Sequence, residues 1–322
     1  MELFDILTDK MFVSGTEIAG ILGISRAAVN KRIAVLRKSG YRIDGQKNMG
    51  YMLISRPDLL LPGEIKRQLE ISGGPETEIH YYKETGSTQS ICKELADRGC
   101  GEGTVVVAER QAQGYGRMKR AWVSPKGGIW FSIVLRPRML PDKVPQITLA
   151  VSIALCRVIK GLTGVNASIK WPNDVVFEGK KIAGILTEMS AEVGRVNWVV
   201  MGIGINANNT AAGELKNTAV SLKDISGIVV NRAELLALLL KEINISFAKL
   251  CKKGFLPIKD EYNKLSVLTG KNIEVDAPEG RISGVASGVD EKGLLRVIDG
   301  KRTHKIIAGE VSMRGLGRRE NG

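Results

Sequence analysis

Residues 170–189 read KWPNDVVFEGKKIAGILTEM and hold three lysines, an aspartate and a glycine-marked turn. Its segment 178–181, Glu-Gly-Lys-Lys, has the composition of a tight turn between two β-runs. We therefore expect a hairpin that returns Lys181 toward Lys170 and Asp174. Two cations near one carboxylate suit a phosphate with its metal, so the hairpin predicts a phosphate-binding site.

A glycine-punctuated basic loop precedes this hairpin. The apolar run 105–108 predicts a buried strand, and it leads into ERQAQGYGRMKRAWVSP at residues 109–125. The glycines permit close approach of the backbone to a ligand, while Arg117, Lys119 and Arg120 bring positive charge to phosphate oxygens. Such a loop can stay mobile until a ligand orders it. On its own, it indicates only generic contact with an anion or nucleic acid.

Polar residues also stand at the start of a predicted helix. Residues 80–83 have the pattern of a strand, and Ser87, Thr88 and Gln89 lead into a helix expected over residues 90–98. The hydroxyls of Ser87 and Thr88 have two candidate roles, which are capping the helix and binding a ligand. A strand expected over residues 197–206 ends in Gly-Ile-Gly-Ile-Asn, where glycines suit either tight packing or the approach of a flat ligand, and Asn206 is placed to face it.

The first sixty residues have the pattern of a DNA reader. Apolar residues recur at helical spacing over residues 2–7 and 16–22, Gly23 interrupts, and Ser25 is placed to cap a third helix. Runs at 40–43 and 51–54 then predict a hairpin, the wing of a winged helix-turn-helix. The alternative is a small domain whose charged helix faces merely keep it soluble or contact protein. The expected DNA-binding residues are Ser25, Arg26, Asn30, Lys31 and Arg37.

Length and composition exclude several classes of protein. The 322 residues exceed the usual size of one domain, so we expect two or three. With 43% hydrophobic and 25% charged residues, disorder, a disulfide scaffold and a membrane protein are disfavoured, and we expect neither a signal peptide nor a membrane-spanning window. Four scattered cysteines and two histidines argue against a transition-metal site and suit a reducing cytoplasm. A formal charge of +13 favours polyanionic partners.

Several of these motifs together resemble those of biotin–protein ligases. The family pattern runs Lys-Trp-Pro-Asn-Asp, a few residues, then Gly-(Arg/Lys)-Lys-(Ile/Leu)-(Ala/Gly)-Gly-Ile-Leu, which residues 170–186 match. The basic loop is similar to the family's Gly-Arg-Gly-Arg-x-Gly-Arg-x-Trp-x-Ser-Pro, but Tyr115 replaces the first arginine and Lys119 replaces a glycine. Residues 24–41 resemble the DNA-binding domain of the bifunctional biotin ligase/repressors. The resemblance spans the chain, and its strongest matches lie between Ser87 and Asn206.

The resemblance implies an α+β multidomain fold. Its parts would be a winged helix-turn-helix over residues 1–60, a linker and helix over 61–78, a catalytic mixed sheet flanked by helices over 79–265, and a small β-barrel with a basic tail over 266–322. It also implies a two-step ligase, in which the biotin carboxylate attacks the α-phosphate of ATP and a carrier-protein lysine then attacks the biotinyl-adenylate. No covalent enzyme intermediate is required, so catalysis would come from positioning and charge stabilisation.

Roles for individual residues follow from the same resemblance. Lys181 and Arg117 would stabilise the carboxylate and phosphate charge, and Asp174 would either orient Mg²⁺ or deprotonate the carrier lysine. The expected biotin contacts are Ser87, Thr88, Gln89, Gln111, Tyr115, Gly116, Arg117 and Lys181. The expected nucleotide contacts are Arg117, Arg120, Lys170, Asn173 and Asn206. A surface lysine in a charge-rich loop is the plainer interpretation of Lys170.

The implied partners are biotin, ATP, Mg²⁺, the biotin carboxyl carrier protein of acetyl-CoA carboxylase and operator DNA, which a ligand-bound homodimer would grip at two half-sites. Two alternatives stay open. Because Tyr115 and Lys119 depart from the family loop, the chain could be a ligand-responsive regulator with weak or lost ligase activity. The other alternative is an enzyme of the related lipoate ligase class, which the Lys-Trp-Pro-Asn-Asp and Gly-Arg-x-x-Arg-x-Trp motifs disfavour.

Overall fold

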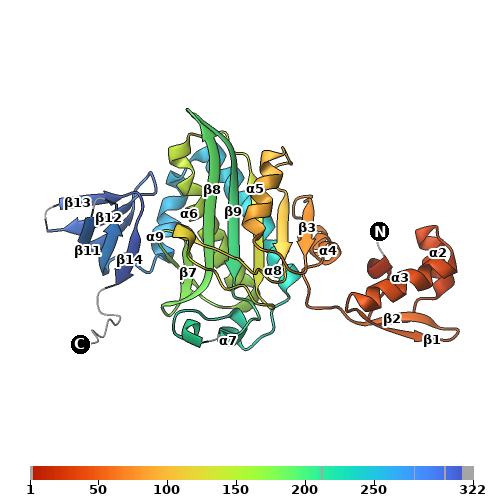
Figure 1. Cartoon of the computed structure of the whole chain (residues 1–322). Helices are drawn as coiled ribbons and strands as arrows, with labels where there is room; N and C mark the ends of the chain where they lie inside the picture. The colour runs from red at the N-terminus through yellow and green to blue at the C-terminus, as the bar shows by residue number, and fades with distance from the viewer. Residues whose placement is uncertain (1–2, 212, 279, 301, 314–322) are drawn as a thin grey trace.

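A central sheet lies between two smaller parts of the chain, one formed by each end of the sequence (Figure 1). The computed structural model describes residues 3–211, 213–278, 280–300 and 302–313. The expected basic tail at Arg318 and Arg319 lies outside these residues. The predicted fold class is confirmed, with a helix-turn-helix part, a central mixed sheet with helices and a C-terminal antiparallel sheet.

The N-terminal part has three helices and a two-stranded hairpin. The Ser25 hydroxyl accepts a hydrogen bond from the Ala28 amide at 3.1 Å, so the predicted cap of the third helix is confirmed. Gly23 ends the second helix in the left-handed conformation at φ 63°, where a side chain would be strained. The elements are α1 (Leu3–Ile6), α2 (Gly15–Leu22), α3 (Arg26–Lys38), β1 (Arg42–Gln46) and β2 (Gly50–Ser55). The strands extend further into the wing than predicted, because pairing continues to Gln46 opposite Gly50.

The central sheet is mixed and has the order β3-β4-β5-β9-β8-β7-β6. Only the β3–β4 pair is parallel among the pairings of the described strands. Most predicted strand positions hold within a few residues. The bounds are β3 (Ile79–Tyr82), β4 (Val105–Ala108), β5 (Ile129–Leu135), β6 (Ser168–Lys170), β7 (Asp174–Phe177), β8 (Lys180–Glu192) and β9 (Arg195–Ile205).

Helices cover both faces of this sheet (Figure 1). Alternate residues of a strand point to opposite faces, and β4 shows the consequence. Val105 and Val107 join the large core beneath α6 (Pro145–Thr163) and α8 (Arg232–Lys253). Val106 joins a separate core under α5 (Thr88–Asp97). The remaining helices and short 3-10 turns are α4 (Pro62–Ser72), α7 (Leu222–Ser226), α9 (Leu256–Leu265), η1 (Arg117–Lys119), η2 (Pro141–Lys143) and η3 (Gly213–Asn217).

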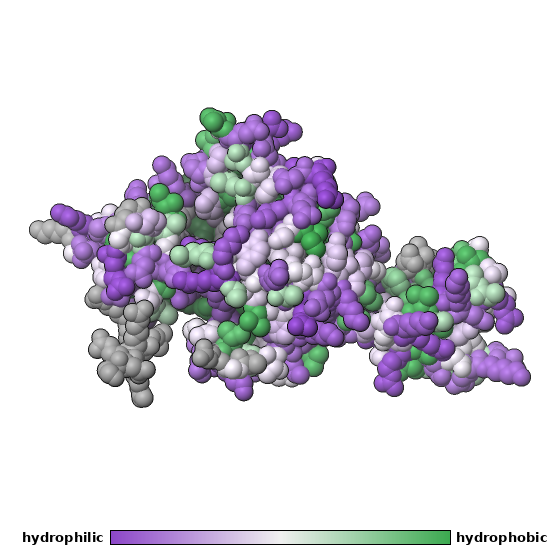
Figure 2. Space-filling model, viewed as in Figure 1, coloured by the Kyte–Doolittle hydropathy of each residue, from purple (hydrophilic) through white to green (hydrophobic). Residues whose placement is uncertain are grey.

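The expectation that no segment is long and apolar enough to cross a membrane needs a correction. The helical segment Pro141–Thr163 meets that test by length and composition. However, 72% of its apolar window is buried inside the protein, between the sheet and α8. The face in Figure 2 is largely hydrophilic, with apolar residues in separate small groups. The apolar length of this helix is therefore explained by its place at the centre of the core.

The predicted hairpin within residues 170–189 is confirmed. Glu178 and Gly179 connect β7 to β8 with φ values of 49° and 80°, and positive φ at both positions is the signature of a two-residue turn that matches strand twist. Across the neighbouring pair of strands, Lys170 lies opposite Asp174. The turn therefore brings Lys181 within 2.8 Å of Asp174, and Lys170 lines the same cavity as both residues.

The C-terminal part is an antiparallel sheet with the order β13-β12-β11-β10-β14. Its strands are β10 (Asn272–Ala277), β11 (Gly280–Val289), β12 (Leu295–Asp299), β13 (Arg302–Ile306) and β14 (Glu310–Met313). Residues 307–309 form the bend between β13 and β14. This bend faces the basic loop of the central domain, as the contacts of the loop arginines show.

Candidate active site

A cavity of about 320 Å³ lies between the central sheet, the basic loop and the bend before β14. This size lies within the usual range for small-molecule sites. The cavity collects all but one of the predicted ligand-binding residues. The predicted residues that line it are Ser87, Thr88, Gln89, Gln111, Tyr115, Gly116, Arg117, Arg120, Lys170, Asn173, Asp174 and Lys181.

Lys181 and Asp174 form the charged centre of the cavity. The Lys181 ammonium lies 2.8 Å from Oδ2 of Asp174, and both side chains are partly buried. The other carboxylate oxygen, Oδ1, is buried and has no hydrogen-bond partner within the described residues. The ammonium also lies 5.4 Å from the centre of the Trp122 ring. A buried acceptor beside a cation is therefore available to a ligand or its metal.

The loop arginines join the cavity to the C-terminal sheet. Arg117 donates to the side chain of Asn173 at 3.3 Å and to the carbonyl of Gly309 at 3.2 Å. Arg120 lies 2.5 Å from a carboxylate oxygen of Glu310. Both guanidinium groups are therefore held at the wall of the cavity by residues about 190 positions away along the chain.

A network of uncharged polar groups forms the opposite end of the cavity. Oε1 of Gln111 accepts hydrogen bonds from the Thr88 amide at 2.8 Å and the Thr88 hydroxyl at 3.0 Å. The side-chain carbonyl of Gln111 therefore satisfies one of the free backbone N–H groups at the start of α5. Ser87 stands at the cap position, but its hydroxyl makes no capping hydrogen bond among the described residues. The capping role is therefore not seen for Ser87 among the described residues, and its contact with a ligand stays a prediction.

The sequence did not reveal a role for Glu188, although this residue lies within residues 170–189. Its carboxylate accepts hydrogen bonds from Gln89 at 3.0 Å and from the Tyr115 hydroxyl at 3.1 Å, and it pairs with Lys93 at 3.0 Å. Burial raises the pKa of Glu188, but the bonds from Lys93 and Gln89 outweigh burial and hold that pKa below its usual value. The one signal in the sequence that could have indicated Glu188 is its position on the same strand, β8, as Lys181.

Tyr115, the departure from the family loop, is fastened to this carboxylate. Tyr115→Phe removes one hydrogen bond to a charged acceptor, which typically contributes about 1.5–3 kcal/mol. We expect the biotinyl-adenylate that the sequence resemblance implies as ligand to dissociate roughly tenfold faster from this variant, measured by chase with unlabelled ligand. Lys119→Ala is the matched control, because it removes a cation 4.6 Å from the same ring and leaves the hydroxyl bond in place. An unchanged rate in Tyr115→Phe would show that the bond does not hold the loop.

The pH dependence of this attachment follows from the lowered pKa of Glu188. A depressed carboxyl pKa means that the interaction is present above the ordinary carboxyl range and is lost as pH falls through the folded value. Adenylate release from the wild type should therefore stay constant from pH 8 to about 5 and accelerate only in stronger acid. Release that changes between pH 6 and 8 would exclude Glu188 as its cause.

Gly184 and Gly204 pack against the ring of Trp122. Like Glu188, Trp122 has no role predicted from the sequence. A Cβ on Gly204 would lie 2.5 Å from the indole nitrogen of Trp122, and one on Gly184 would lie 2.9 Å from its ring. A Cβ on Gly202 would lie 2.5 Å from Oε1 of Gln89. The indole nitrogen is itself buried without a hydrogen-bond partner within the described part of the chain. Of the two interpretations of Gly202 and Gly204, tight internal packing fits these contacts, and the approach of a flat ligand stays a prediction.

Gly204→Ala tests the packing of this glycine against Trp122. Overpacking of this kind costs about 1–3 kcal/mol, so we expect kcat/KM for the ligase reaction that the sequence resemblance implies to fall roughly tenfold, because the Trp122 ring must move. Gly161→Ala in α6 is the control, since an added Cβ there meets nothing within 4 Å and should leave kcat/KM unchanged. Equal activity of both variants would show that the position of the Trp122 ring does not affect the reaction.

Asn206 is the predicted ligand contact that the structure places outside the cavity lining. Its side-chain amide donates to the carbonyl of Lys181 at 3.3 Å, and its carbonyl oxygen accepts from Asn209 at 3.0 Å. Its contacts thus support the backbone of the key lysine. A direct nucleotide contact of Asn206 stays a prediction.

The predicted DNA-binding residues divide into two groups. Arg26 and Lys31 are exposed on α3. Asn30 accepts a hydrogen bond from the Tyr51 hydroxyl of the wing at 2.7 Å, and Arg37 donates to the Ile43 carbonyl at 2.9 Å. Asn30 and Arg37 therefore connect α3 to the wing, and their contact with DNA stays a prediction, as does that of the capping Ser25.

Fold and cavity together define a class of protein, an adenylate-forming ligase domain with a winged-helix domain before it and a small β-domain after it. Family models described as HTH domain, Biotin/lipoate A/B protein ligase family and Biotin protein ligase C terminal domain match residues 2–52, 82–206 and 269–314. The chain is 38% identical over 319 residues to the bifunctional ligase/repressor BirA of Bacillus subtilis (strain 168), covering 97% of each chain. Its namesake from Escherichia coli (strain K12) is 29% identical, with 98% and 97% covered.

A solved structure has the same fold. It is a biotin protein ligase from Aquifex aeolicus in complex with biotin and ATP, which matches with a TM-score of 0.65 and 32% identity over 74% of this chain and 98% of that one. The chain belongs to the family of bifunctional biotin–protein ligase/repressors. The family and the ligase class expected from the sequence are confirmed.

Proposed function

We propose that this protein forms biotinyl-adenylate from biotin and ATP and transfers biotin to a lysine of the biotin carboxyl carrier protein of acetyl-CoA carboxylase. The observation that carries the proposal is one cavity with two chemically distinct ends. Hydroxyl and amide groups of Ser87, Thr88 and Gln111 suit the ring urea of biotin at one end. Lys181, Arg117 and Arg120 suit carboxylate and phosphate oxygens at the other.

In the first step, a carboxylate oxygen of biotin attacks the α-phosphate of ATP, and pyrophosphate leaves. Negative charge moves from the attacking carboxylate to the leaving phosphates. Lys181 is placed to follow that charge, because a compact ammonium on a flexible stem can adjust its direction. Arg117, held by Asn173 and Gly309, fixes the phosphates in a constant position.

In the second step, the amine of the carrier lysine attacks the acyl carbon of biotinyl-adenylate, an amide forms and AMP leaves. The amine must lose a proton to do so. Asp174 supports two roles in the overall reaction, as the base for this proton or as a ligand of Mg²⁺. Its orphaned Oδ1 fits a single carboxylate ligand, since Mg²⁺ takes most of its remaining contacts from water and substrate phosphates. When bound, Mg²⁺ would neutralise phosphate charge, while Asp174 keeps Lys181 oriented.

The winged-helix domain supports a second role as a biotin-responsive repressor. Arg26 and Lys31 are exposed where an α3 recognition helix meets DNA, and a homodimer would bring two such helices to a two-fold symmetric operator. Biotinyl-adenylate would be the corepressor. The use of ATP and the four free cysteines suit action in the cytoplasm.

The test of the ligase is transfer of labelled biotin to a purified apo carrier domain with ATP and Mg²⁺. We expect transfer that depends on both nucleotide and metal. Competition by lipoate distinguishes the lipoate ligase alternative, because a biotin-specific site should not be inhibited by equimolar lipoate. Biotin binding without any transfer would support the alternative of a regulator that has lost ligase activity.

Repression is tested with DNA duplexes that the wild type selects from a random pool in the presence of biotin and ATP. Lys31→Ala should weaken binding to all selected duplexes and lower the slope of log affinity against log salt by about 1, as loss of one phosphate contact does. Asp9→Ala, on the loop after α1, is a control for a charge change outside the recognition helix. Failure of the wild type to select any duplex would contradict the repressor role.

A further inference from the structure

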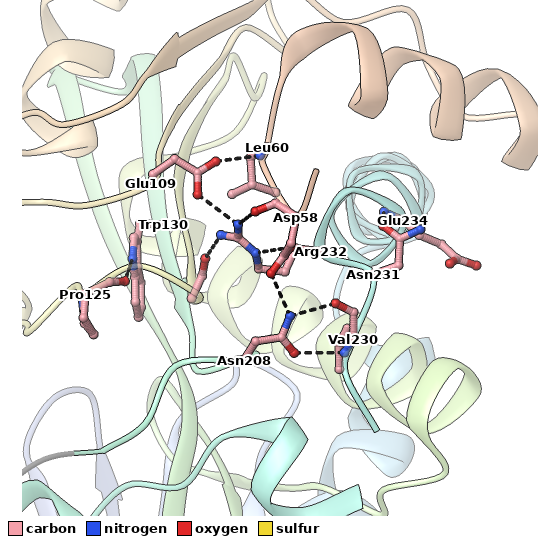
Figure 3. Close-up of polar contacts among 11 residues, drawn as sticks. Asp58, Leu60, Glu109, Pro125, Trp130, Asn208, Val230, Asn231, Arg232 and Glu234 are labelled. Carbon is pink, nitrogen blue, oxygen red and sulfur yellow. Dashed lines mark hydrogen bonds and ion pairs between the residues drawn. The ribbon is translucent and has the colours of Figure 1, made fainter. Parts of the chain in front are cut away.

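A buried arginine joins the two ends of the ligand-binding loop. Arg232, the first residue of α8, is 2% exposed in its side chain. Its guanidinium donates to the Glu109 carboxylate at 2.9 Å (Figure 3). It also donates to the Gly128 carbonyl at 2.8 Å. Glu109 directly follows β4 and Gly128 directly precedes β5, so one side chain closes the base of the loop that carries Gln111, Tyr115, Arg117 and Arg120.

The same guanidinium also holds the linker from the DNA-binding domain. It donates to the Asp58 carboxylate at 2.6 Å and to the Asp58 carbonyl. Two residues later, the Leu60 amide donates to the second oxygen of Glu109 at 2.6 Å. Asn208, which follows β9, donates to Asp58 at 3.2 Å (Figure 3). The linker and the loop therefore share a single ion-pair cluster, in which Arg232 and Glu109 are buried and Asp58 is half-exposed.

The linker is fastened just as firmly on its other side. Arg56 pairs with Glu64 of α4 at 2.6 Å and donates to the Phe4 carbonyl of α1 at 3.1 Å. The Tyr41 hydroxyl, at the base of the wing, also donates to Glu64 at 2.6 Å. Glu64 is only 4% exposed. Contacts thus continue without a gap from the winged-helix domain through the linker to the loop.

We propose that Arg232 is a positioning residue for the ligand loop and that, through Asp58, it transmits occupation of the cavity to the linker of the DNA-binding domain. The proposal rests on the ligand-binding part of the proposed function. A ligand held by Gln111 and Arg117 restrains the loop between them. Because both loop ends share the Arg232 guanidinium with the linker, restraint of the loop also restrains residues 58–60. The ligand would in this way reduce the number of positions open to the winged-helix domain before DNA is bound.

The Leu60 amide provides a direct measurement, since its hydrogen bond ends on Glu109. Hydrogen exchange is followed in the full chain with and without biotin plus ATP, for wild type, Asp58→Ala and Glu261→Gln. Asp58→Ala keeps the buried Arg232–Glu109 pair and changes a half-exposed side chain, so the fold should persist. Glu261→Gln weakens the partly exposed ion pair with Arg157 between α9 and α6 and serves as the matched control.

In the wild type and in Glu261→Gln, ligand should slow exchange of the Leu60 amide by a factor of about 5 or more, the lower range of measured couplings between sites. In Asp58→Ala this ratio should fall toward 1, while peptides of the loop over residues 109–125 keep their ligand protection. A purely structural role of Asp58 would change the exchange rate equally with and without ligand and leave the ratio unchanged, which would overturn the proposal.

Two further outcomes separate the proposal from the function on which it rests. Protection of the loop in the wild type, with no change at Leu60, would overturn the coupling alone. Absence of ligand protection in the loop itself would contradict biotin and ATP binding, and with it both proposals. Arg232→Lys adds a check on positioning, since a lysine cannot hold Glu109, Gly128 and Asp58 together in the planar geometry of a guanidinium. It should raise KM for biotin more than it lowers kcat.

Discussion

Lys181→Ala is expected to lower the rate of biotinyl-adenylate formation by a factor of at least about 100–1,000, the usual loss when one group that stabilises transition-state charge is removed. The Lys181 ammonium lies 2.8 Å from Asp174 and lines the cavity beside Arg117. Without it, charge that develops between the biotin carboxylate and the α-phosphate has no compact cation to follow it. The measurement is biotin-dependent exchange of labelled pyrophosphate into ATP, which reports the first step alone.

The control for this prediction is the neighbouring residue. Lys180→Ala removes the same charge from the same hairpin, but Lys180 is exposed and is not among the residues that line the cavity. Its pyrophosphate exchange should stay near the wild-type rate. Transfer of biotin from added biotinyl-adenylate should be less affected in Lys181→Ala than exchange is, because the second step leaves fewer phosphate charges to stabilise. Near-normal exchange in Lys181→Ala would contradict its assignment.

Arg232→Ala should destabilise the central domain by about 3–5 kcal/mol, because it leaves the Glu109 carboxylate buried without its ionic partner. Both side chains of this pair are only 2% exposed. The loss should appear as a lower urea midpoint for the central domain, followed by tryptophan fluorescence, since Trp130 lies in its core. Combining Arg232→Met with Glu109→Leu should recover most of this loss, because two apolar side chains leave no buried charge unpaired.

An exposed arginine shows what the burial contributes. Arg157→Ala breaks ion pairs with Glu261 and Glu242, but the Arg157 side chain is 44% exposed. Exposed pairs of this kind contribute about 0–1 kcal/mol, so its urea midpoint should shift little. Equal midpoints for Arg232→Ala and Arg157→Ala would mean that water reaches Glu109 when the arginine is removed.

Local patterns were sufficient to predict much of the fold and the charged half of the site. The turn at Glu178 and Gly179 needs positive φ at two successive residues, and few sequences supply it, so the position of Lys181 followed from a short segment. The cap at Ser25 and the buried apolar run of β4 are likewise properties of adjacent residues. The winged helix and the central strands could therefore be predicted without any long-range contact.

What could not be predicted depends on residues that are distant in sequence. Glu188 is 73 positions from Tyr115, and Gly309 is 192 positions from Arg117. No periodicity in a single sequence specifies such pairs. Arg232 is a further case, because an arginine at the start of a helix is usually solvated, and only the fold shows that three segments converge on it. The predicted domain boundaries remain predictions for the same reason.

The burial of Leu60 limits where the winged-helix domain can be separated from the central domain. Leu60 is fully buried in the core of the central domain, and its amide satisfies Glu109. A truncation between residues 60 and 61, the border that sequence patterns suggest, would remove the DNA-binding domain. It would also remove Leu60 from the core of the central domain and so destabilise the enzyme. Ligases that lack the winged helix through gene loss or recombination would need either to retain a few residues ahead of α4 or to replace Glu109 and Arg232 together.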